Sequence, residues 1–130
     1  MKKMTRILLI DDDTITNYIN ERLITKLGIC KEVIVAHNGF EGLAWLRNII
    51  NQNNILPDLI LLDINMPVMN GIEFLDAFKK FNFKAKRAVK ILLLTTSANS
   101  QDMEKVKALG INGIVNKPLT EEKIRECLVC

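Results

Sequence analysis

The chain has 130 residues, a net charge of +3, an apolar fraction of 48% and a charged fraction of 25%. This length fits one domain whose core can fold without disulfides. The mild charge gives no reason to expect DNA binding, and no apolar run reaches the roughly 18–20 residues that cross a bilayer. We therefore expect a single cytoplasmic domain over residues 1–130 that binds neither DNA nor membrane.

Short apolar runs alternate with amphipathic segments along the first half of the chain, which is the pattern of β-α units. Residues 6–10 (RILLI) predict a strand, and the next segment predicts a helix that ends at Gly28. Residues 32–36 predict a second strand, and Asn38 is a candidate N-cap for a second helix. The first helix is predicted from an apolar stripe at every fourth position, formed by Ile15, Ile19, Leu23 and Leu27.

The second half of the chain continues the same alternation. Residues 58–63 (DLILLD) are apolar without a break, as in a strand covered on both faces. Further strands are predicted at 91–94 and around 113–115, and further helices after 67–71, at 101–109 and after the N-cap Thr120. Five β-α units with right-handed crossovers predict an α/β three-layer sandwich around a parallel sheet.

Chemically active side chains stand where the predicted strands end. They are Asp11, Asp12 and Asp13 after the first strand, Asp63 on the third, Thr95 on the fourth and Lys117 after the fifth. Because the carboxyl ends of parallel strands meet at one edge of a sheet, we expect these groups to converge. Crowded carboxylates need a cation, and hard oxygen ligands suit Mg²⁺. A lysine and a hydroxyl beside the metal suit phosphoryl oxygens, so Asp63 is the candidate nucleophile of an acyl-phosphate reaction.

Each of these residues also has a purely structural interpretation. Asp13 is a candidate N-cap of the first helix, and Asp63 is also compatible with the start of a turn. Thr95 is compatible with an ordinary strand-end hydroxyl, and Lys117 with a surface lysine. All four interpretations would have to hold together to remove the predicted site.

Four segments resemble the receiver domain of response regulators, the phosphoacceptor module of two-component signalling. They are ILLIDDD, DLILLDINMPVMNGIEFL, ILLLTTS and NKPL, which occur in the family's order and close to its spacing. The resemblance covers essentially the whole chain and is to the CheY-like, stand-alone response regulators. It implies a flavodoxin-like (βα)5 fold with strand order 2-1-3-4-5, and a single receiver domain without an output domain. It also implies a protein that is not an enzyme in the ordinary sense, accepting phosphate from phosphohistidine and slowly losing it by autodephosphorylation.

The same resemblance implies a metal site for Mg²⁺ (or Mn²⁺). Asp63 is the phosphoacceptor and a ligand, Asp12 binds the metal directly, and Asp11 supports it through water. The backbone carbonyl of Asn65 completes the protein ligands.

Further positions take roles in the signal. Lys117 contacts the phosphoryl group, and Thr95 is the switch hydroxyl that moves toward it. Ile114 stands where the family usually has an aromatic switch residue, so coupling is expected to rest on backbone shifts in the loop after Thr95. Asn65 and Ser97 flank the hydrolytic water and are expected to tune the lifetime of the phosphoryl group.

The implied partners are a sensor histidine kinase or a histidine-containing phosphotransfer protein, and a downstream protein that binds around residues 101–129. A switch, a phosphorelay intermediate and a phosphate sink all remain open, as does a receiver that serves only as a scaffold. A haloacid-dehalogenase-type phosphatase with Asp11 as nucleophile is an alternative, but it needs a late acidic pair, and no Asp follows Asp102. A flavin-binding module would need aromatic stacking residues, and the sequence has one Trp and one Tyr.

Overall fold

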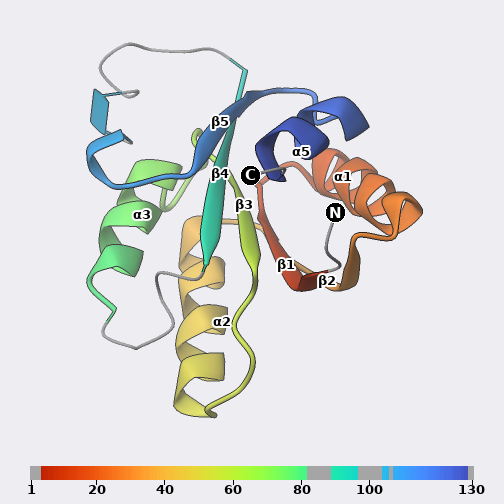
Figure 1. Ribbon diagram of the computed structural model, residues 1–130. Coiled ribbons are helices and arrows are strands. Elements are labelled where there is room, and N and C mark those ends of the chain that lie inside the picture. The colour runs from red at the N-terminus through yellow and green to blue at the C-terminus, as the bar shows by residue number, and fades with distance from the viewer. Residues whose placement is uncertain (1–3, 82–88, 97–103, 106, 129–130) are drawn as a thin grey trace.

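The computed structural model describes residues 4–81, 89–96, 104–105 and 107–128, and shows five parallel strands in one sheet with order β2-β1-β3-β4-β5 (Figure 1). This order confirms the predicted flavodoxin-like sheet. The strands are β1 (Met4–Ile10), β2 (Cys30–Ala36), β3 (Leu59–Asp63), β4 (Lys90–Thr95) and β5 (Gly113–Asn116). The helices are α1 (Thr14–Leu27), α2 (Gly39–Asn51), α3 (Gly71–Lys79) and α5 (Glu121–Leu128). None of the helices in the described ranges has the length and apolar character that a bilayer span requires.

Helices cover both faces of the sheet, with α1 and α5 on one side and α2 and α3 on the other (Figure 1). Alternate residues of β1 therefore enter two separate cores: Leu8 and Ile10 pack on the α2 and α3 side, and Ile7 and Leu9 on the α1 and α5 side. All four are at most 2% exposed. Burial on both faces explains why β1, β3 and β4 are apolar without alternation.

Part of the chain expected to form a fourth helix lies outside the described residues. Residues 104–105 and 107–108 are helical, within the predicted range of 101–109, and Gly110 follows them with a φ of 80°. Ser97, Met103 and Val106 are among the residues that are not described.

The ends of the helices follow the predicted capping residues. The Asp13 carboxylate accepts a hydrogen bond from the Ile15 N–H at the start of α1. Gly28 ends α1 in the left-handed region, with a φ of 65° that a residue with a side chain rarely adopts. The Asn38 side chain caps α2. These caps fix where α1 and α2 begin relative to β1 and β2, and so shape the loops around the site.

The helix predicted from the apolar stripe is confirmed as α1, but the stripe packs on the core only in its second half, at Leu23 and Leu27. Ile15 and Ile19 are 69% and 56% exposed, whereas Asn17, Asn20 and Ile24 are buried. A stripe at every fourth residue moves about 40° around the helix at each step, because a turn takes only 3.6 residues. The stripe therefore faces the core near its end and leaves it toward the start of α1.

Candidate functional site

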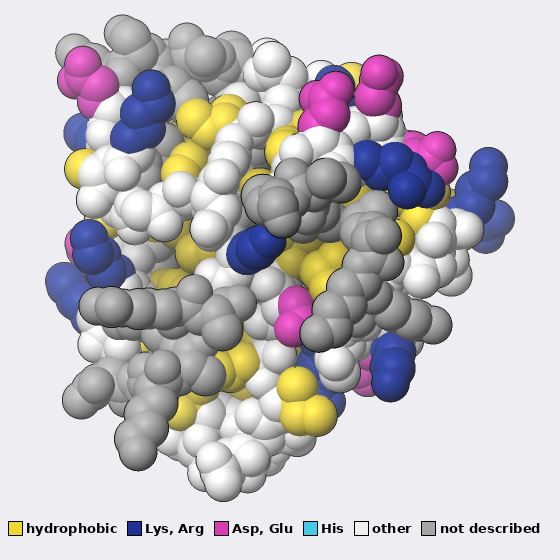
Figure 2. Space-filling view, viewed as in Figure 1, with side chains coloured by type: hydrophobic (Ala, Val, Ile, Leu, Met, Phe, Trp, Pro, Cys, Tyr) yellow, Lys and Arg dark blue, Asp and Glu magenta, His cyan; other side chains and the backbone are white. Residues whose placement is uncertain are grey.

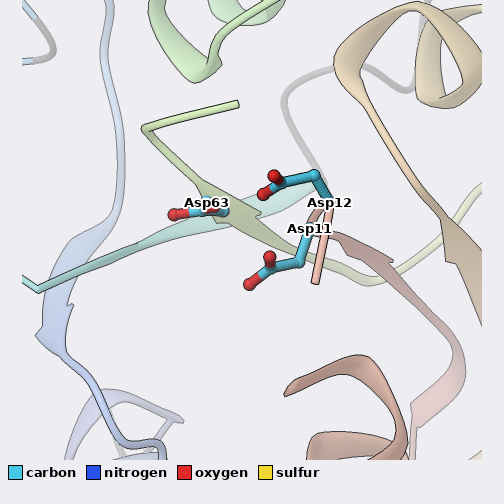
Figure 3. A group of neighbouring side chains, drawn as sticks. All are labelled: Asp11, Asp12 and Asp63. Atoms are coloured by element: carbon cyan, nitrogen blue, oxygen red, sulfur yellow. The ribbon is translucent and has the colours of Figure 1, made fainter. Parts of the chain in front are cut away.

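Three carboxylates meet at the carboxyl edge of the sheet (Figure 3). Asp11 and Asp12 directly follow β1, and Asp63 is the last residue of β3. Because β1 and β3 are neighbours with Ile10 opposite Leu62, the residues that follow are brought side by side. One oxygen from each carboxylate lies within 4.8 Å of the others, and the three groups point to the same side in Figure 3. The predicted convergence of these acidic residues is confirmed.

One ammonium group is shared between two of the carboxylates. The Lys117 Nζ lies 2.8 Å from Asp11 Oδ2 and 3.3 Å from Asp63 Oδ1. Asp11 and Asp63 are 3% and 5% exposed, whereas Asp12 is exposed. Three carboxylates with one lysine leave an excess of negative charge in a largely dry setting, which favours the binding of a cation.

The protonation of the site reflects this crowding. Burial, followed by the charge of Asp11, raises the pKa of Asp63 from 3.8 to about 6, although Lys117 and a backbone hydrogen bond from Asn65 oppose the shift. Burial lowers the pKa of Lys117, but the hydrogen bond and charge of Asp11 and the charge of Asp63 outweigh it, and the net shift is upward. Asp63 is therefore poorly stabilised as a carboxylate in the absence of a further cation, while Lys117 stays charged.

Asp13, the third residue of the DDD run, has a separate role. Its carboxylate accepts hydrogen bonds from the Ile15 N–H at 3.0 Å and the Thr16 hydroxyl at 2.9 Å, and the Thr16 bond is the main cause of its lowered pKa. Its own N–H donates to Asp11 Oδ1 at 2.9 Å. The capping interpretation of Asp13 is confirmed, and this residue helps to hold the Asp11 carboxylate.

Gly71, which belongs to the segment that resembles the receiver family, has a packing role that the sequence analysis did not identify. A Cβ at this position would lie 2.7 Å from the backbone oxygen of Asp63 and 2.8 Å from the Cα of Ile64. The Gly71 N–H also donates to the Ile64 carbonyl at 2.9 Å. Glycine thus lets the first turn of α3 pack directly against the end of β3. In the sequence this glycine ends the turn predicted at 67–71 and lies within the DLILLDINMPVMNGIEFL segment.

The remaining predicted site residues are placed as follows. Thr95 ends β4 next to Leu94, which pairs with Asp63, and is fully buried. Its carbonyl accepts the Lys117 N–H at 2.8 Å. Asn65 is exposed two residues after Asp63, and Ile114 lies on β5 and is 37% exposed. Ser97 lies outside the described residues.

The donor set fits a hard divalent cation. The oxygens of Asp11, Asp12 and Asp63 lie within 4.8 Å of one another, so that one small ion can reach several of them. Carboxylate oxygens, with open positions left for water, are the ligands that Mg²⁺ prefers over the nitrogen and sulfur ligands of zinc.

Comparison with known proteins agrees with this geometry. The chain is 31% identical to two-component response regulator 24 of Arabidopsis thaliana, over 93% of this chain and 79% of that protein. It is 28% identical to a probable chemotaxis protein CheY of Rhizobium etli, over 95% of this chain and 88% of that protein. A solved two-component response regulator from Cytophaga hutchinsonii has a TM-score of 0.86 and 31% identity, and the match covers 97% of this chain and 95% of that one.

The match also extends to receiver segments inside much larger proteins. The chain is 33% identical, over 92% of its length, to the hybrid signal transduction histidine kinase G of Dictyostelium discoideum, but spans only 3% of that kinase. The family model of the response regulator receiver domain matches residues 7–129. With the sheet order, the acidic edge and the paired Lys117 in place, the chain belongs to the family of response regulator receiver domains.

Proposed function

We propose that Asp63 accepts a phosphoryl group from the phosphohistidine of a sensor histidine kinase or a histidine-containing phosphotransfer protein. The observation that carries this proposal is the meeting of the three carboxylates within 4.8 Å, with Lys117 3.3 Å from Asp63. Asp63 is buried at the end of a central strand, so its oxygen is held in a fixed direction, as in-line attack requires.

The transfer breaks the P–N bond of the donor and forms a P–O bond to an Asp63 oxygen, and the electron pair of the broken bond stays on the imidazole nitrogen. Negative charge is spread over the equatorial oxygens of the phosphoryl group in the transition state. The Lys117 ammonium, already 3.3 Å from Asp63, is placed to stabilise that charge. Thr95 supplies a hydroxyl at the end of the neighbouring strand.

The metal ligands would be Asp11, Asp12, Asp63 and the backbone carbonyl of Asn65. Bound there, Mg²⁺ (or Mn²⁺) would neutralise developing charge on the phosphoryl oxygens. Lys117 would hold the Asp11 carboxylate through their 2.8 Å contact, so that this side chain stays turned toward the site.

The phosphohistidine donor must dock beside this edge, and the outer face of α1 supplies an apolar surface for it. Ile15, Tyr18 and Ile19 are 69%, 60% and 56% exposed. A groove of about 320 Å³ runs between α1 and the segment after β5, lined in part by Ile19, Lys117 and Leu119. A partner helix seated in this groove would bring its phosphohistidine next to Lys117.

On the face of the molecule in Figure 2, Lys and Arg side chains lie at separate places among Asp and Glu, which favours a protein partner over DNA.

The signal would leave through Thr95 and the adjoining loop toward a downstream protein around residues 101–129. Ile114 pairs with Leu93 on β4 and is partly exposed, so it has room to change its rotamer. Asn65 and Ser97 would tune the lifetime of the phosphoryl group before autodephosphorylation. A switch, a phosphorelay intermediate and a phosphate sink use this same chemistry and differ in the next acceptor, all in the cytoplasm.

A haloacid-dehalogenase-type reaction at Asp11 fits the geometry less well. One Asp11 oxygen accepts from Lys117 and the other from the Asp13 N–H, so both are already engaged. Asp63 lies farther from Lys117, at 3.3 Å against 2.8 Å for Asp11, and burial followed by the charge of Asp11 raises its pKa to about 6.

The test is labelling by a small phosphodonor, such as acetyl phosphate, with Mg²⁺. Intact mass should show one added phosphoryl group on the wild-type protein and on Asp76→Asn, a control at an exposed residue of α3 whose carboxylate pairs with Lys80. Asp63→Asn and wild type with excess EDTA should show none. Labelling that survives in Asp63→Asn would contradict the proposal, and labelling on Asp11 would favour the phosphatase.

A further inference from the structure

A buried asparagine lies directly beneath the acidic loop. Asn17, in the first turns of α1, is 4% exposed, and its Nδ2 donates a hydrogen bond of 2.8 Å to the backbone carbonyl of Asp11. Among the residues that the structure describes, its Oδ1 is the single buried side-chain nitrogen or oxygen with no hydrogen-bond partner. The assignment of the two atoms follows from the contact, because only the amide nitrogen can donate to a carbonyl.

The half-satisfied amide is a cost to the folded state. A buried polar atom without a partner destabilises a protein by about 1–3 kcal/mol. A leucine has the same branched shape, with two somewhat larger methyl groups in place of the amide atoms, and leaves no buried polar atom unpaired. Asn17 therefore contributes little to stability overall, since the unpaired Oδ1 offsets most of the hydrogen bond that Nδ2 makes.

The hydrogen bond from Asn17 holds the peptide between Asp11 and Asp12, two residues of the acidic site. The Asp11 carbonyl belongs to the peptide that joins Asp11 to Asp12, so holding it sets the direction in which the Asp12 side chain leaves the backbone. The Asp11 carboxylate has two partners of its own, Lys117 and the Asp13 N–H. The Asp12 carboxylate is exposed and has no hydrogen bond or ion pair within the described part of the chain. Its placement thus depends on the backbone that Asn17 holds.

We propose that Asn17 is a positioning residue, which orients Asp12 as a metal ligand by clamping the Asp11–Asp12 peptide. This inference rests on the proposed metal site at the same edge of the sheet. An apolar residue could fill this space, but it could not donate a hydrogen bond to the Asp11 carbonyl. Asparagine supplies that donor, and its unpaired Oδ1 is the destabilising consequence.

The test compares Asn17→Leu with Asn20→Leu, which makes the same change at a second buried asparagine of α1. Mg²⁺ affinity is measured by calorimetry, and thermal unfolding is followed in EDTA. Asn17→Leu should weaken Mg²⁺ binding about tenfold, as loss of a group that orients a ligand does, while its unfolding temperature in EDTA stays within a few degrees of wild type. Asn20→Leu should leave Mg²⁺ affinity within twofold.

The outcomes separate this inference from the proposed function. A wild-type protein that binds no Mg²⁺ would overturn both. Wild-type binding with equal affinity in Asn17→Leu would overturn only the role of Asn17, as would a variant that loses stability in EDTA without losing affinity.

Hydrogen exchange on the wild-type protein tests the same proposal even if the Asn17→Leu variant fails to fold. If the hydrogen bond favours metal binding, metal binding must favour the hydrogen bond to the same extent. Mg²⁺ should therefore slow hydrogen exchange of the Asn17 side-chain amide more than that of Asn20, and equal slowing would contradict the proposal.

Discussion

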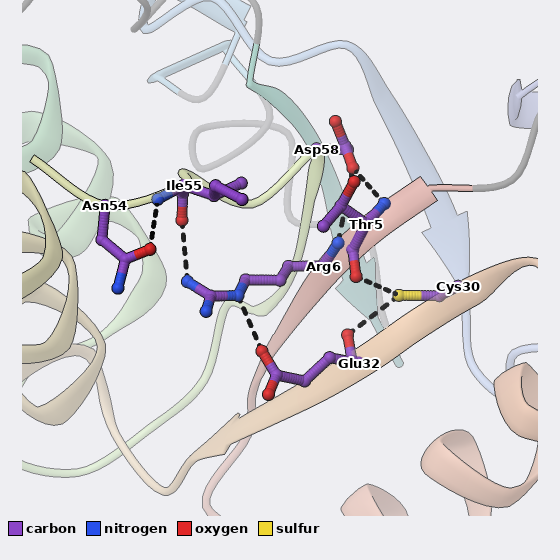
Figure 4. Close-up of polar contacts among 7 residues, drawn as sticks. All are labelled: Thr5, Arg6, Cys30, Glu32, Asn54, Ile55 and Asp58. Atoms are coloured by element: carbon purple, nitrogen blue, oxygen red, sulfur yellow. Dashed lines mark hydrogen bonds and ion pairs between the residues drawn. The ribbon is translucent and has the colours of Figure 1, made fainter.

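The two ends of the sheet handle their carboxylates in opposite ways. At the amino end, Asp58 Oδ2 accepts backbone N–H bonds from Thr5 at 2.6 Å and Arg6 at 3.4 Å, while the Arg6 side chain pairs with Glu32 at 2.7 Å (Figure 4). At the carboxyl end, three carboxylates meet, and the ammonium of Lys117 pairs with two of them, Asp11 and Asp63.

The difference shows which polar groups hold the fold and which are available for binding. Asp58 is matched by donors already present, so it joins the start of β1 to the segment before β3. At the carboxyl edge, burial followed by the charge of Asp11 raises the pKa of Asp63, and the donors present there do not offset the shift. A polar group that the fold leaves incompletely satisfied is a candidate for binding something from outside.

The largest expected effect comes from removing the Asp63 carboxylate, and it is on the stability of the protein in metal-free buffer. A shift of the Asp63 pKa from 3.8 to about 6 corresponds to about 3 kcal/mol. Between these values the folded state holds the proton more tightly than the unfolded state, so wild-type stability should fall as pH rises from 4 to 6 and then level off. Urea unfolding of Asp63→Asn should lack this fall and show higher stability at pH 7. A wild-type stability that rises over the same range would contradict the pKa assignment.

At the opposite end, Asp58→Ala should weaken the fold and spare the chemistry. The substitution removes the carboxylate that accepts from the N–H groups of Thr5 and Arg6, which should lower the free energy of unfolding by about 2 kcal/mol. Urea unfolding measures the loss, and intact mass after acetyl phosphate treatment measures phosphorylation. The variant remains folded without urea. Reduced labelling under that condition would contradict the expectation that the amino and carboxyl ends of the sheet act independently.

Exposed apolar residues offer a second way to compare the two ends. Ile19→Ser near the carboxyl end should slow phosphotransfer from a phosphorylated histidine phosphotransfer protein by about tenfold, with no change in labelling by acetyl phosphate. Ile55→Ser is the matched control, because Ile55 is also 56% exposed but lies before β3, at the amino end. Equal slowing by both variants would argue against docking along α1. Both changes should alter stability by less than about 0.5 kcal/mol.

The smallest effect is expected within the DDD run itself. Asp13→Asn keeps a good N-cap at the start of α1, so the urea midpoint of unfolding should stay close to that of wild type. Calorimetry should show Mg²⁺ affinity within twofold of wild type, since the Asp13 carboxylate bonds to Ile15 and Thr16, and the substitution keeps the backbone N–H that bonds to Asp11. A tenfold weaker affinity would make Asp13 a ligand instead of a cap.

The sequence predicted the fold and the meeting of the acidic residues for a physical reason. Unbroken apolar runs identify strands buried on both faces, and whatever follows such strands in a parallel sheet is brought to one edge. Asp11, Asp12 and Asp63 could thus be grouped before any coordinates. The precise pairing of Lys117 with Asp11 and Asp63 could not, because it depends on the path of the segment after β5.

Packing decided the features that the sequence did not reveal. Asparagine is mostly a surface residue, so the burial of Asn17 and Asn20 could not be read from hydropathy. The exposure of Ile15 and Ile19 likewise depends on how α1 packs on the sheet. The need for glycine at position 71 depends on the close approach of α3 to Asp63, a contact between backbones that no pattern of side chains reports.

The most direct measurement of the central claim is a titration with Mn²⁺ followed by amide NMR, because a paramagnetic ion broadens the signals of nearby residues. The amides of residues 11–13 and 63–65 should broaden at low Mn²⁺, and added Mg²⁺ should restore them, while Thr5, Arg6 and Asp58 stay sharp. Broadening at both ends of the sheet, or none at residues 11–13 and 63–65, would contradict a divalent-cation site at the carboxyl edge.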